Sequence, residues 1–145
     1  GPAITRLAGA DFTRATIRST DFSGAVLTAV TFDEALLDGV TFSGADLTAA
    51  TFNGTVVLEA DFTGVSLKRA DFGGAIVFGD DFLSRLDSVD APDTIRPELF
   101  QLEPLATSEL SGLMVVQNAL TPEDIAARTK GAAPFRVTRI GEFGP

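Results

Sequence analysis

Two stretches decide the fold of this chain: Ala60-Asp61-Phe62-Thr63-Gly64 and Ala70-Asp71-Phe72-Gly73-Gly74. Each is one copy of a five-residue pattern that repeats from Thr5 to Ser84 with a large apolar residue at its centre. Phenylalanine takes the centre of every second quintet, and leucine, isoleucine or valine takes the centre of the others. The phenylalanines form a predicted core ladder: Phe12, Phe22, Phe32, Phe42, Phe52, Phe62, Phe72 and Phe82.

A repeat of five residues suits neither of the common elements. On a helix, five residues advance a side chain by about 140° and scatter the large residues, and on a flat strand the large residues would alternate between faces. The conflict disappears if the chain runs extended for about three residues and then turns a corner. Each large residue and the small residue two before it then point inward, and the polar residue between them points outward.

The number of sides follows from residues that recur in columns. Gly24, Gly44 and Gly64 lie twenty residues apart, at a corner position where a type II turn needs positive φ. Twenty residues correspond to four quintets, so we expect a four-sided coil in which Phe32 stacks on Phe12. A three-sided coil would stack phenylalanine on leucine instead. Residues 5–84 hold sixteen quintets, which predicts about four coils.

The pattern resembles that of the pentapeptide-repeat family: Ala, then Asp or Asn, then Leu or Phe, then two variable residues. Residues 60–64 and 70–74 nearly match this consensus, whereas Asp80 departs from it by replacing the small residue. The resemblance implies a bacterial protein with an all-β solenoid fold, a right-handed quadrilateral β-helix. We expect the β-helix over residues 3–84, followed by a linker and a mainly α-helical C-terminal cap or appendage over residues 85–145.

The pattern stops at Asp87, where the next large inward residue should stand, and the rest of the chain is the obvious candidate for a cap. Its residues predict a turn-rich linker over 87–96, a helical turn over 98–102, a helix or strand over about 108–120, a helix over 121–131 and a strand over 135–140. Thr121 and Pro122 are a strong helix start.

Composition excludes several classes of function. The chain has no cysteine, histidine or tryptophan, so thiol chemistry, imidazole catalysis and thiolate or imidazole metal sites are ruled out. We expect no enzyme activity, no cofactor and no metal. The net charge of −9 disfavours direct binding to nucleic acid or to an anionic membrane. The sequence contains no membrane-length apolar run and no signal peptide, so we expect a soluble, cytoplasmic protein.

One outward face carries an apolar stripe where the pattern permits polar residues. We expect it to be a docking face for the C-terminal region, or else an interface with a second copy or another protein. The stripe is made of five residues: Leu36, Val56, Leu58, Ile76 and Phe78.

Two other outward faces carry columns of carboxylates, among them Asp11 and Asp71 on one face and Asp21 and Asp61 on the other. Such columns fit a cation site or a mimic of DNA phosphates, but we expect each carboxylate to be solvated or bonded to corner amides. Glu34 and Glu59 are the nearest acid–base candidates, and both are predicted at corners without a pocket.

These residues favour a non-catalytic structural or protein–protein interaction module. A homodimer is one form of it, through the apolar stripe, an open coil end or the C-terminal helices. The first coil in particular should present unpaired backbone groups that an upstream segment, the C-terminal region or a second copy would cover. The family resemblance implies an alternative, a DNA-mimicking inhibitor or protector of type II topoisomerase (gyrase), as in quinolone-resistance proteins.

Overall fold

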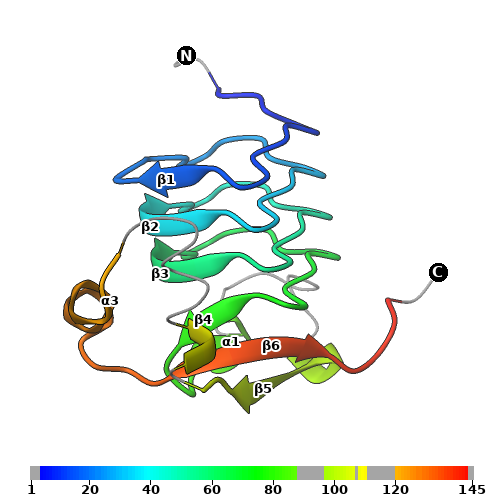
Figure 1. Cartoon of the computed structure of the whole chain (residues 1–145). Helices are drawn as coiled ribbons and strands as arrows, with labels where there is room; N and C mark the ends of the chain where they lie inside the picture. The colour runs from blue at the N-terminus through cyan, green and yellow to red at the C-terminus, as the bar shows by residue number, and fades with distance from the viewer. Residues whose placement is uncertain (1–3, 88–96, 107, 111–119, 144–145) are drawn as a thin grey trace.

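Stacked coils form a rod in the computed structural model of the chain, which describes residues 4–87, 97–106, 108–110 and 120–143 (Figure 1). One side of the rod is made of four parallel strands: β1 (Thr16–Arg18), β2 (Leu36–Thr41), β3 (Val56–Asp61) and β4 (Ile76–Phe78). Ile17 lies beside Leu37, and Leu37 lies beside Val57. Neighbouring coils are therefore twenty residues apart, which is the spacing predicted for a four-sided coil.

The phenylalanines stack in two columns inside the rod. The rings of Phe12 and Phe32 are 5.3 Å apart and within 9° of parallel, so the predicted stacking of these two residues is confirmed. The closest pair is Phe52 and Phe72, at 4.3 Å and 4°. Side chains fill the interior, because the rings of Phe32, Phe42, Phe52 and Phe72 are fully buried. The rod is thus a packed core without a lumen.

Each corner of the rod is a tight turn. At one of them the Ala25 N–H donates to the Phe22 carbonyl at 3.0 Å, and Gly24 between them has a φ of 69°. Some corners use residues with a side chain, such as Glu34 with a φ of 59°. At Gly74, which has a φ of 85°, a Cβ would lie 2.9 Å from the Asn53 amide oxygen, so a larger residue there would require the Asn53 side chain to move.

The rod ends earlier than the sequence predicts, because the last quintet folds as helix α1 (Phe82–Asp87). The Asp81 carbonyl accepts the Arg85 N–H at 2.9 Å, which is the first hydrogen bond of this helix. Phe82 is still buried, but its ring meets that of Phe62 edge-on, at 90°, instead of stacking on it. The β-helix predicted to reach residue 84 therefore stops before Phe82.

Strands close the lower end of the rod. The 3-10 helix η1 (Pro97–Leu99) leads into β5 (Phe100–Pro104), and β6 (Pro134–Arg139) lies between β5 and β4, antiparallel to both. Helix α3 (Pro122–Thr129) lies against the side of the rod (Figure 1).

The predicted mainly α-helical cap is not confirmed, because the described residues of this region mix helix α3 with strands β5 and β6, which extend the sheet of the rod. The helical turn predicted over 98–102 is η1 followed by strand. The predicted helix at Thr121 and the predicted strand over 135–140 are confirmed as α3 and β6, and Thr121 caps α3 by accepting the Asp124 N–H. Most of the linker over 87–96 and of the element over 108–120 lies outside the described residues.

Candidate interaction surfaces

The apolar stripe is covered by the chain's own C-terminal region. All five of its residues are buried, with exposed fractions between 1% for Leu36 and 8% for Phe78. They form one cluster with four residues from beyond the rod: Leu105, Leu110, Leu120 and Ile125. Ile125 is the buried residue of α3. In this structure the stripe is therefore an internal contact, and a partner would have to displace the C-terminal region to reach it.

A buried carboxylate adds a polar contact beside this cluster. Asp38 on β2 is only 2% exposed, and its carboxylate pairs with the guanidinium groups of Arg18 on β1 and Arg128 on α3. A buried charge is costly unless it is paired, so the two arginines are needed where Asp38 lies. The Arg128 contact also ties α3 to the rod.

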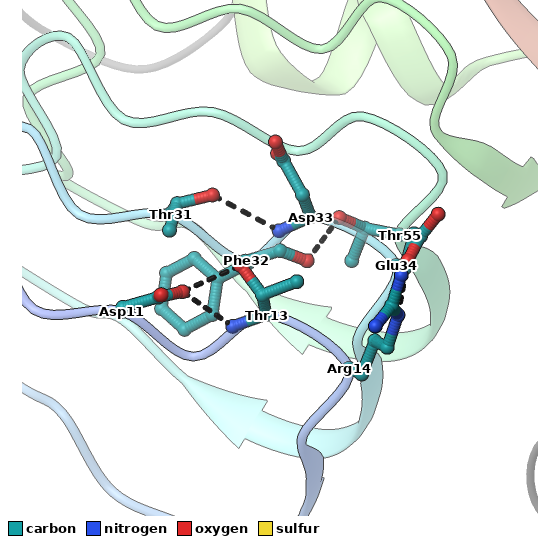
Figure 2. Close-up of polar contacts among 8 residues, drawn as sticks. All are labelled: Asp11, Thr13, Arg14, Thr31, Phe32, Asp33, Glu34 and Thr55. Atoms are coloured by element: carbon teal, nitrogen blue, oxygen red, sulfur yellow. Dashed lines mark hydrogen bonds and ion pairs between the residues drawn. The ribbon is translucent and has the colours of Figure 1, made fainter.

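The carboxylate columns are bonded within their own turns. Figure 2 shows the Asp11 carboxylate accepting the hydroxyl and the N–H of Thr13, the latter at 2.9 Å. Asp61 accepts the same pair of groups from Thr63. These hydrogen bonds, from the hydroxyl first and then from the N–H, lower the pKa of both carboxyl groups, because they favour the charged form.

Contacts between coils also engage acidic residues. The Arg14 guanidinium pairs with Glu34 in the coil below at 2.7 Å (Figure 2), and Arg139 of β6 pairs with Asp71 at 2.9 Å. In the part of the chain that the structure describes, no three carboxylates gather into a potential metal site. These acidic side chains are therefore bonded within their own turns or paired with an arginine of another coil or strand.

The upper end of the rod is open over the described residues. Leu7, Phe12 and Phe22 are only partly buried, whereas Phe32 and Phe42, one coil below, are fully buried. The backbone shows the same contrast. The Thr31 N–H donates to the Ala10 carbonyl one coil above, but no described residue accepts the corresponding N–H of Asp11.

A cleft of about 660 Å³ lies on another side, where β3, α1 and the end of α3 meet. Glu59, Phe62, Phe82, Arg85 and Lys130 are among its lining residues. The prediction that Glu59 has no pocket beside it is therefore wrong. The volume is within the range of ligand-binding sites in proteins.

Comparison with known families decides which family this rod represents. The family of pentapeptide repeats matches residues 5–44 and 42–77, with eight copies of the repeat. Together these matches span residues 5–77, which are 73 of the 145 residues. The chain belongs to the pentapeptide-repeat family. Proteins of this family form right-handed quadrilateral β-helices.

Several solved pentapeptide-repeat proteins are similar to this one. HetL of the cyanobacterium Nostoc, a protein involved in the regulation of heterocyst differentiation, is 31% identical over 50% of this chain and 36% of its own, with a TM-score of 0.36. This pentapeptide-repeat protein thus spans about a third of the length of HetL. A protein of the Arabidopsis thaliana thylakoid lumen is 23% identical over 62% of this chain and 79% of its own, with a TM-score of 0.31. Comparison with curated proteins finds no match.

Two features of this pentapeptide-repeat protein were missed by sequence reasoning. Asp38 was passed over, although a lone carboxylate among apolar outward residues is the signal of a buried ion pair. The cleft at Glu59 gave no signal, because α3 reaches it from more than sixty residues further along the chain. No helix among the described residues is both long and apolar enough to cross a membrane.

Proposed function

We propose that this pentapeptide-repeat protein is a non-catalytic interaction module that binds a second copy of itself through the first coil of the rod. One observation carries the proposal: among the described residues, the core side chains and backbone groups of the first coil lack the contacts that the next coil gives to their equivalents. Ile4 is 54% exposed beside the partly buried Leu7 and Phe12. An exposed strand edge of this kind is a template for pairing with another chain.

A second copy of the chain is the expected partner for this open end, because its own first coil has the same exposed strand edge. Two rods placed head to head on a two-fold axis would bring the edges of their first coils together, so that edge N–H groups such as that of Asp11 can meet carbonyls of the partner. The opposite end of the rod supports this geometry, since β4 there pairs antiparallel with β6. The phenylalanines of the two first coils would then cover each other.

Sedimentation equilibrium over a range of concentrations tests the proposal. We expect a monomer–dimer equilibrium that Ile4→Asp shifts strongly to monomer, because the charge would be buried between the two first coils. Ile140→Asp is a matched control, since Ile140 is 56% exposed and lies at the opposite end of the rod. A protein that stays monomeric at every concentration, or equal effects of the two variants, would contradict the proposal.

The alternative of a DNA-mimicking gyrase inhibitor has less support. A phosphate mimic needs a groove of unpaired acidic charge, whereas Asp11 and Asp61 are bonded within their turns and Asp71 is paired with Arg139. We therefore expect no inhibition in a gyrase supercoiling assay at protein concentrations that saturate the dimer.

A further inference from the structure

The cleft beside β3 exists because one strand of the lowest coil is replaced by a helix. In the coils above, each phenylalanine on this side donates its N–H to the coil beneath: Phe22 to the Thr41 carbonyl at 2.7 Å and Phe42 to the Asp61 carbonyl at 2.8 Å. The next acceptor in this column would be Asp81. Its carbonyl instead accepts the Arg85 N–H, as the start of α1.

Three backbone groups of β3 and the following turn are left open as a result. The N–H groups of Phe62 and Gly64 have no acceptor among the described residues, and the Ala60 carbonyl has no donor there. The equivalent groups one coil higher are paired, for example the Gly44 N–H with the Thr63 carbonyl at 2.9 Å. Phe62 is also 8% exposed, whereas Phe42 above it is fully buried.

These three groups fit an extended polypeptide better than a small anion. In the rod, Thr41 satisfies the corresponding groups of the first coil with both its N–H and its carbonyl, and Ser43 provides the second carbonyl. An extended peptide can provide the same donor and two acceptors by lying parallel to β3, which is the strand-addition mode of peptide recognition. A free anion accepts hydrogen bonds but has no donor for the Ala60 carbonyl.

The side chains around the cleft indicate the charge of the peptide. Lys130 and Arg85 line the cleft at the ends of α3 and α1, and Lys130 forms no ion pair with any described residue. Arg128 also lines the cleft but pairs with Asp38, and Arg85 pairs with Asp81. Glu59 and Asp61 are the acidic lining residues. Phe82 also lines the cleft, with the Arg85 guanidinium over its ring. Lys130, which no described carboxylate pairs, is therefore the group that complements an acidic side chain of the ligand.

We infer that this cleft binds an extended acidic peptide segment of a partner protein, which takes the place of the missing strand of the lowest coil. The peptide pairs with Ala60, Phe62 and Gly64 through its backbone and with Lys130 through an acidic side chain. The site is separate from the first coil, so self-association through that coil neither requires nor excludes it.

Amide hydrogen exchange measured by NMR tests the backbone part of the inference. In the free protein we expect fast exchange at Phe62 and Gly64 and slow exchange at Phe42 and Gly44, their equivalents one coil higher. The probe is a short peptide of alternating glutamate and valine with blocked ends. Its addition should slow exchange at Phe62 and Gly64. Slow exchange at these two residues in the free protein, or no change on saturation with the peptide, would overturn the inference.

Fluorescence anisotropy with the labelled peptide tests whether binding depends on acidic side chains and backbone N–H groups of the peptide. Replacing glutamate by lysine in the peptide should abolish binding, and full N-methylation of the peptide should weaken it by about tenfold or more because its donors are lost. Lys130→Glu should weaken binding about fivefold, and the matched Lys68→Glu on the exposed rod surface should not change it. Equal binding of the N-methylated peptide, or equal effects of the two variants, would contradict strand addition in this cleft.

Discussion

The two ends of the rod are built from the same repeat, but only the lower end is closed within the described residues. At the lower end, β6 pairs with β4, and the Val137 N–H and carbonyl bond to the backbone of Ala75 and Gly74. At the upper end, no described element lies over β1. The side chain of Val137 is fully buried, whereas Phe12 at the upper end is only partly buried.

This difference shows that the contribution of a core residue to folding stability depends on which coils or strands lie above and below it. Apolar burial stabilises in proportion to the area removed from water, so identical side chains in identical columns should contribute unequally at the two ends. Each repeat contacts only its neighbours, and stability is therefore a sum of local contacts along the rod.

The largest effect is expected from truncating a phenylalanine in the middle of the rod. Phe52→Ala should lower the free energy of unfolding by about 3–5 kcal/mol, because the ring is fully buried and stacks on Phe72. Phe12→Ala should cost less, about 1–2 kcal/mol, because its ring is partly exposed. Urea denaturation at low protein concentration measures both values. Equal losses would mean that the first coil is covered and would break the comparison.

A smaller loss in the free energy of unfolding is expected from weakening the packing of β6 at the lower end. Val137→Ala should lower the free energy of unfolding by about 2 kcal/mol, through two lost methyl groups and the cavity they leave. Ile140→Ala is the control, with a change within about 0.5 kcal/mol, because that side chain is mostly exposed. If both variants unfold at the same urea concentration as the unchanged protein, β6 does not stabilise the rod.

The smallest change in stability is expected from the aspartates in the turns, whose pKa values should respond alike near both ends of the rod. The pKa values of Asp11 and Asp61 are lowered by Thr13 and Thr63, so their contribution to stability is present above the ordinary value of 3.8 and is lost as the pH falls through the lower pKa of the folded state. Thr13→Val and Thr63→Val should each raise the pKa of the neighbouring aspartate toward 3.8, as followed by NMR titration. If the pKa of only one aspartate changes, packing at the end of the rod, and not the hydrogen bonds of the turn, determines the pKa.

The repeat could be predicted from the sequence because its signals are local and recur. A small residue two places before a large one, and glycines such as Gly24 and Gly44 twenty residues apart, determine the corner geometry and thus the stacking of Phe32 on Phe12. The helix after Thr121 could be predicted for the same reason, since its cap lies within four residues.

The closure and the cleft could not be predicted, because they depend on contacts between distant residues. Whether the last quintet continues the rod or begins α1 is decided by competition for the Asp81 carbonyl. Asp80 departs from the repeat pattern in this quintet, but that departure alone does not predict a helix. The pairing of β6 with β4 and the contact of Arg128 with Asp38 likewise join positions about 60 and 90 residues apart. Sequence patterns within a window of a few quintets contain no information on such pairs.

The late closure of the lower end also has a consequence for synthesis of the chain. Coils pair at a separation of twenty residues, as Ile17 with Leu37, whereas Val77 of β4 pairs with Phe135 of β6 across 58 residues. Each coil can therefore stack soon after it leaves the ribosome, but the edge of β4 stays bare until β6 has been translated. At ordinary translation rates this interval lasts about 3–12 seconds. During that time the nascent rod is most open to strand pairing with a neighbouring nascent chain.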